Sequence, residues 1–187
     1  MGTITEAADD EKDSQLTEDQ LKELNRLQRF YWSEAKRSEA ANAHLAGCVM
    51  LGSAVECLLL LFTDIYLDEA LKTGETPRNR NGKMKHLLDW TLADLLRVAR
   101  AANWFPETID GKKAAIRDSS GTLKRIRNLV HPAAYLRDHP RGRVTKKALD
   151  FSFETALDAR DWLLDRLETD IAAKLEQEET EERSQDT

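Results

Sequence analysis

Three residues near the middle of the chain carry side chains that suit phosphate chemistry. In the stretch "IRNLVHP", residues 126–132, Arg127, Asn128 and His131 lie within five positions. On a helix, Arg127 and His131 share a face because they are four residues apart. A guanidinium can hold a phosphate and stabilise charge on its oxygens, and an imidazole can act as general acid or base. The pattern predicts phosphodiester cleavage without a metal, with Asn128 orienting the other two groups.

The same residues also fit a structural role. Arg127 can pair with a carboxylate such as Glu56, the only acid within the apolar run 45–62. Asn128 and His131 can hydrogen-bond the carbonyl groups at a helix end that the following proline creates. A buried carboxylate needs a partner, so Glu56 can equally orient Arg127 or His131 for catalysis. The sequence leaves both interpretations open.

A basic segment surrounds this motif. The chain carries a net charge of −6, which argues against a protein that coats nucleic acid through bulk charge. Between Lys112 and Lys147, however, eleven basic residues stand against two acidic ones. Within this segment Arg137, Arg141 and Arg143, in the loop "RDHPRGR", are predicted to hold an RNA backbone. A solvated basic face, or pairing with acidic helices of the same molecule, would explain the same charges.

Composition predicts an all-α fold with one domain. The chain contains four prolines and eight glycines, and 33% of its residues are charged. This composition, with abundant Leu, Ala, Glu, Lys and Arg, is typical of helix-rich soluble proteins. The folded domain is expected at residues 16–176. The tails, 1–15 and 177–187, are acidic and nearly free of apolar residues, so we expect them to be disordered.

About five helices with short connections should pack as a bundle. Apolar periodicity and turn residues place them at about 18–37, 38–72, 84–102, 116–130 and 152–176. Thr17 and Gln20 form a capping-box signature for the first helix. Small residues in the second helix should allow a neighbouring helix to approach closely. The last helix is expected to present one apolar stripe of Phe153, Leu157, Leu164, Leu167, Ile171 and Leu175.

Other classes of protein find little support in the sequence. The acidic amino terminus lacks the apolar core of a signal peptide, so we expect a cytoplasmic protein. Glu56 near the centre of the run 45–62 favours a buried helix over a membrane span. Cys48 and Cys57 are nine residues apart on one expected helix and point to opposite sides, so they should be reduced core residues. No His or Cys spacing fits a metal site, and neither a metal nor another cofactor is expected.

The order of these features resembles the HEPN superfamily. The resemblance covers roughly residues 40–137 and is carried by a buried second helix with "GSAVECLLL", a helix with "KHLLDWTLADLLRVA", and "LKRIRNLVHPAAYLR" with its RN…H element. It implies a HEPN-like helical bundle and a metal-independent endoribonuclease that works as a homodimer. Arg127, Asn128 and His131 would form half of a composite site. The RNA 2′-hydroxyl would attack the adjacent phosphate, leaving a 2′,3′-cyclic phosphate and a 5′-hydroxyl.

The motif departs from the family pattern in its spacing, which leaves two functions open. Arg127 and His131 have three residues between them, whereas the family pattern has four to six. Counting from Arg125 gives five, with Ile126 where the family favours a polar residue. The first hypothesis is a ribonuclease acting as a toxin or defence effector, with an antitoxin or another defence-system protein as partner. The alternative is a non-catalytic HEPN-like module that dimerises or binds a nucleotide or RNA.

Overall fold

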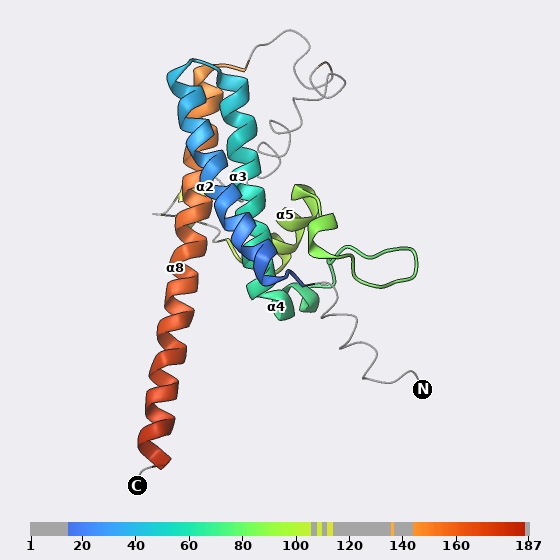
Figure 1. Cartoon of the computed structure of the whole chain (residues 1–187), viewed down its shortest axis with the longest axis vertical. Coiled ribbons are helices and arrows are strands. Elements are labelled where there is room, and N and C mark those ends of the chain that lie inside the picture. The colour runs from blue at the N-terminus through green and yellow to red at the C-terminus, as the bar shows by residue number, and fades with distance from the viewer. Residues whose placement is uncertain (1–14, 106–107, 110–111, 114–135, 137–143, 186–187) are drawn as a thin grey trace.

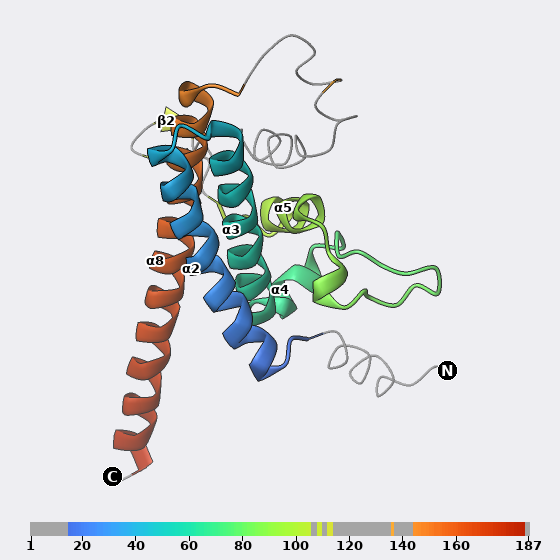
Figure 2. The same cartoon turned by 45° about the horizontal axis from the view of Figure 1, so that its top comes forward.

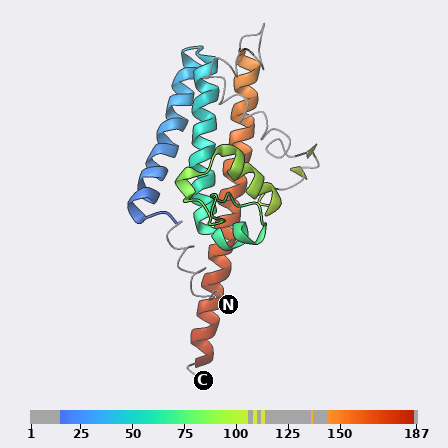
Figure 3. The ribbon, with the colours of Figure 1, turned by 90° about the vertical axis from the view of Figure 1, so that its right-hand side faces the viewer.

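The computed structural model describes residues 15–105, 108–109, 112–113, 136 and 144–185, and in this part the expected all-α bundle is confirmed. Three long helices, α2 (Glu18–Ala40), α3 (His44–Ile65) and α8 (Lys146–Gln185), lie side by side. The short helices α4 (Leu67–Lys72) and α5 (Leu92–Ala101) lie on one side of this group (Figures 1 and 3). The helix expected at 116–130 lies outside the described residues, as does nearly all of the expected tail 1–15.

Helix α2 begins where the capping signature places it. The Thr17 side chain accepts a hydrogen bond from the Gln20 backbone N–H at 3.3 Å, and the Gln20 side chain accepts one from the Thr17 N–H at 2.9 Å. The preceding residue ties this end to α3, because the Leu16 N–H donates to Asp64 Oδ1 at 2.8 Å. The helix ends at Ala40, and Asn42 turns the chain with a φ of 55°, a conformation that Asn tolerates better than most residues.

The single helix expected at 38–72 is wrong, because the structure divides this range into the end of α2, then α3, then α4. The second break is at Tyr66, whose backbone leaves the helical conformation at φ −108° and ψ 35°. Its ring stacks on Phe62 with 4.3 Å between centroids, and its hydroxyl donates to Asp170 Oδ2 on α8 at 2.6 Å. The break is therefore accompanied by contacts that the local sequence does not reveal.

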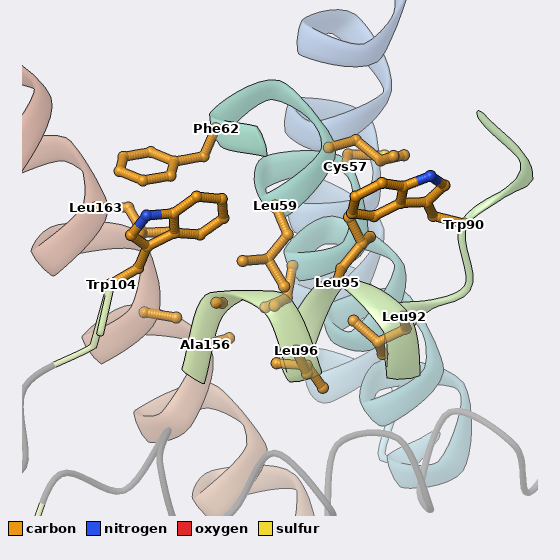
Figure 4. Close-up of a cluster of buried hydrophobic side chains, with 14 of the residues drawn as sticks. Cys57, Leu59, Phe62, Trp90, Leu92, Leu95, Leu96, Trp104, Ala156 and Leu163 are labelled. Atoms are coloured by element: carbon orange, nitrogen blue, oxygen red, sulfur yellow. The ribbon is translucent and has the colours of Figure 1, made fainter. Parts of the chain in front are cut away.

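Helix α3 is the central element and packs against α2, α5 and α8. By length and composition it could cross a membrane, and 56% of its most apolar window is buried inside the protein. Its small residues admit α8 closely, as expected. A Cβ added at Gly47 would lie 2.7 Å from Leu149 Cδ1. The core continues through α5 to two buried tryptophans, Trp90 and Trp104 (Figure 4).

The helix expected at 84–102 begins later than predicted. Residues 73–86 form a loop, η1 (Leu87–Asp89) is a single 3₁₀ turn, and only then does α5 begin. Thr91 caps α5 in a second capping box, with its side chain accepting from the Asp94 N–H at 3.3 Å. The sequence "TLAD" contains this capping box. The start of α5 was nevertheless predicted too early, because the apolar periodicity begins before Thr91 and continues past it. Beyond α5, β1 (Thr108–Ile109) and β2 (Lys112–Lys113) pair antiparallel.

Helix α8 is longer than expected at both ends. It starts at Lys146 rather than near Ser152, and it continues through residues 177–185, where a disordered tail was expected. Glu and Gln are good helix formers, and extending an existing helix does not repeat the cost of nucleation. At 1.5 Å per residue the helix is roughly 60 Å long. Its carboxyl-terminal part projects beyond the ends of α2 and α3 (Figure 1).

Candidate functional site

The predicted catalytic residues lie outside the described part of the chain. This holds for Arg127, Asn128 and His131, and also for the supporting Arg125. The predicted RNA-binding arginines also lie outside it, at positions 137, 141 and 143. Their roles therefore stay predictions. Glu56 is the one predicted site residue whose surroundings the structure describes.

Glu56 lies midway along α3 and faces the start of α5. Its side chain is half-buried, and Oε1 accepts a hydrogen bond from the backbone N–H of Leu92 at 3.1 Å. Leu92 is the first residue of α5, so the carboxylate lies at the positive end of that helix dipole. The expectation that Glu56 needs a partner is confirmed, and one partner is a backbone amide. A contact with Arg127 or His131 remains a prediction.

The environment of Glu56 also affects the neighbouring thiol. Burial, and secondarily the Glu56 carboxylate, raise the pKa of Cys57 from 9.0 to about 11. Burial raises the pKa of Cys48 as well, although its sulfur lies 3.5 Å from Ser152 Oγ, whose hydrogen bond opposes that rise. Both cysteines are buried and unbridged, as predicted. Their protonated thiols are poor nucleophiles, which fits a role in the core rather than in chemistry.

A second polar cluster, which no pattern in the sequence predicted, joins α4 to α8. Arg166 Nη2 donates to both oxygens of Glu69, at 2.7 and 2.9 Å, and the indole N–H of buried Trp104 donates to Glu69 Oε2 at 2.9 Å. The Arg166 guanidinium also lies over the Tyr66 ring, 4.7 Å from its centroid. Burial, together with the hydrogen bond to Asp170, raises the pKa of Tyr66 to about 12.

This cluster has a structural explanation. Its acceptors and donors satisfy one another, and they join residues 97 positions apart in the sequence. Satisfied side chains of this kind fix the position of α8 against the α3–α4 junction. No spacing pattern could have revealed them, because the partners lie on separate elements.

An apolar groove opens between α2, α3 and α8. It has a volume of about 360 Å³, and polar groups of Asn25, Gln28, Arg29 and Arg160 edge it. The Arg160 guanidinium lies over the Trp32 ring, 5.0 Å from its centroid, and also pairs with Asp161 at 2.6 Å. The remaining lining is aliphatic or aromatic and comes from α3 and α8: Leu58, Leu61, Phe62, Ile65, Leu163, Leu164 and Leu167. Such a surface suits an apolar side chain rather than a reacting phosphate.

Among the residues that the structure describes, no group of three or more His, Cys, Asp or Glu side chains is placed to hold a metal ion. Comparison with known proteins adds no family assignment: no protein-family model, no curated protein and no solved structure matches the chain. The class that the structure defines is therefore an all-α helical bundle. Any more specific function has to be argued from the residues of the chain itself.

Proposed function

We propose that the protein is a metal-independent endoribonuclease of the HEPN type. The observation that carries the proposal is the group Arg127, Asn128 and His131, set in a segment with eleven basic and two acidic residues. Arg127 clamps the scissile phosphate, and His131 transfers a proton to or from the reacting oxygens. Asn128 orients them. The 2′-hydroxyl attacks the phosphorus, the 5′-oxygen leaves and takes a proton, and the products carry a 2′,3′-cyclic phosphate and a 5′-hydroxyl.

Two features of the described structure support the proposal. The fold is an all-α bundle with a buried helix at the place of "GSAVECLLL", as the resemblance implies. Within that helix, the Glu56 carboxylate is held by the Leu92 N–H, which gives it a fixed position. A carboxylate in a fixed position can orient a guanidinium or an imidazole of the proposed site.

A homodimer is part of the proposal, because two copies of the trio would form one composite site. Apolar side chains exposed on α8 give a second copy a surface to cover. Leu164, Ile171 and Leu175 are 40%, 49% and 56% exposed and follow one another at helical spacing. Leu164 also lines the apolar groove, so the groove and the exposed apolar residues of α8 share this side chain.

The test is an RNA cleavage assay in the presence of EDTA. Wild-type protein should cleave RNA and leave 2′,3′-cyclic phosphate ends, and Arg127→Ala and His131→Ala should abolish cleavage while the protein stays folded and dimeric. Lys36→Ala is a suitable control, because it removes an exposed charge from α2, outside the basic segment that contains the motif. A cleavage rate unchanged by His131→Ala would remove the catalytic assignment.

A second candidate function is a non-catalytic module in which the same trio binds a phosphate or shapes the dimer. The short spacing between Arg127 and His131, with three residues in between, favours it. In this case a folded dimer would cleave no RNA, and His131→Ala would lower the melting temperature or weaken dimerisation. Under the first function, the toxin or defence role implies an antitoxin or another defence-system protein as partner. A cytoplasmic location belongs to the same proposal.

A further inference from the structure

The loop between α4 and α5 contains a hairpin with a defined conformation, residues 76–86, here called the basic hairpin. Arg78 and Met84 pair as an antiparallel bridge, and the Asn79 N–H donates to the Lys83 carbonyl at 2.8 Å. Asn79 Oδ1 accepts the Lys83 N–H at 3.1 Å, and Gly82 turns the chain with a φ of 79°. The segment projects beside α5, away from α2 and α8 (Figures 1 and 2).

The basic hairpin concentrates positive charge in a chain that is acidic overall. It carries four basic residues within eight positions, and no acidic residue occurs between Thr76 and Leu88. The four side chains are exposed; they are those of Arg78, Arg80, Lys83 and Lys85.

In the described part of the chain, Arg78, Arg80 and Lys85 have no carboxylate partner. The nearest preceding acid, Glu75, pairs with Arg97 on α5 at 3.2 Å. Arg78 Nη1 donates to the Gly82 carbonyl at 2.8 Å, so its guanidinium braces the turn without meeting a carboxylate. Within the part of the chain that the structure describes, Arg80 and Lys85 have neither a hydrogen bond nor an ion pair from their side chains. Clustered cations repel one another, and an anionic ligand would relieve that repulsion.

We propose that the basic hairpin binds the phosphate backbone of single-stranded RNA. Guanidinium and ammonium groups are the side chains that proteins use for phosphates, and they act without reading the base sequence. The tip, "NRNGK", has no aromatic or aliphatic side chain to anchor a protein partner or to enter a membrane. The choice of RNA as the polyanion rests on the proposed function. The binding element itself is separate from the Arg127 to His131 motif.

The test measures binding without cleavage. A fluorescein-labelled 12-nucleotide 2′-O-methyl RNA lacks the attacking hydroxyl, so wild-type protein can be titrated by fluorescence anisotropy at several salt concentrations. Arg80→Gln/Lys85→Gln should weaken binding roughly ten-fold at low salt and should reduce the slope of log K against log salt by about 1.4, or about 0.7 per lost phosphate contact. Arg78 is kept in these variants because it braces the turn.

Lys22→Gln/Lys36→Gln is the matched control. It also removes two exposed charges, but from α2. The control should keep the wild-type slope, and all proteins should have the same melting temperature. Equal slopes for the two double variants, or no RNA binding by wild type at low salt, would overturn the proposal. If Arg80→Gln/Lys85→Gln weakened binding to poly-glutamate as much as binding to RNA, the ligand of the hairpin would be an acidic protein instead of RNA. Because the probe cannot be cleaved, failure of the ribonuclease assay would leave this result unaffected.

Discussion

Glu56 is the residue at which the structure and the proposed function can be tested together. Its carboxylate accepts the Leu92 N–H at 3.1 Å and lies at the amino terminus of α5. A hydrogen bond to a charged acceptor contributes about 1.5–3 kcal/mol, and a carboxylate at a helix amino terminus adds about 0.3–1 kcal/mol. Glu56→Ala loses both contributions. Glu56→Gln keeps an acceptor for the amide and loses only the charge.

We therefore expect Glu56→Ala to lower the free energy of unfolding by about 2–4 kcal/mol, and Glu56→Gln by about 1–2.5 kcal/mol, because a neutral acceptor makes a weaker hydrogen bond than a charged one. Urea unfolding followed by tryptophan fluorescence measures both. Glu23→Gln is the control, because Glu23 is an exposed acid on α2 that pairs with Arg26 at 2.6 Å, and solvent screens such a pair so strongly that its loss should leave the urea midpoint unchanged. Equal losses for the two Glu56 variants would refute the hydrogen-bond argument.

The same variants address the role of Glu56 in cleavage. If Glu56 only fixes α5, Glu56→Gln should cleave RNA at the wild-type rate under conditions in which it is fully folded. If its charge orients Arg127 or His131, the rate should fall at least ten-fold while the protein remains folded. Single-turnover cleavage well below the unfolding transition separates the two outcomes.

Three further predictions concern stability and assembly. Glu69→Ala should cost about 1–3 kcal/mol more than Glu69→Gln, because it leaves the buried Trp104 N–H without an acceptor. In a Trp104→Phe background this difference in the free energy of urea unfolding should become smaller, and only the part due to Arg166 should remain. The pKa of the Cys57 thiol is about 9.0 in the unfolded chain and about 11 in the native protein. As the pH rises, the unfolded state loses this proton first. The free energy of unfolding should therefore fall by about 2 kcal/mol between pH 9 and pH 11. Cys57→Ala should flatten this part of the pH profile, and an unchanged profile would contradict the assignment. If the proposed homodimer forms through this surface, Ile171→Asp/Leu175→Asp should lower the molar mass measured by light scattering from that of a dimer to that of a monomer. The melting temperature of the monomer should not fall, because both side chains are exposed.

Local signals in the sequence were sufficient where the cause of an element is local. The start of α2 follows from Thr17 and Gln20, three residues apart, and the structure contains both hydrogen bonds of the capping box. The break at Tyr66 was not predictable in this way. Its ring stacks on Phe62, four residues earlier, but its hydroxyl contacts a carboxylate 104 residues away, and nothing near position 66 indicates that second partner. The start of α5 lies between these two cases. Thr91 and Asp94 form a local capping signal, but the prediction followed the longer apolar pattern and placed the start too early.

The candidate site, too, has one feature that the sequence predicted and another that it could not predict. That Glu56 would need a partner followed from one acid in an apolar run, because an unpaired buried carboxylate is costly. Which group would pair with it did not follow. Its backbone partner at Leu92 comes from the start of another helix, and that position depends on how α5 packs against α3. For the same reason the arginine and histidine of the motif can be proposed as a pair from their spacing, but their distance from Glu56 cannot be read from the sequence.

The two faces of α8 explain why its apolar stripe was only partly predicted. The face buried in the bundle is made largely of small side chains, including Ala156 and Ala159, which an apolar pattern understates. The stripe predicted from large residues instead includes Leu164, Ile171 and Leu175, which lie on the surface of the single chain. A helix that buries one face and exposes large apolar residues on another has a surface left for a second partner. In this chain that surface shares Leu164 with the groove between α2, α3 and α8, which is why the proposed second copy would cover this face rather than the buried one.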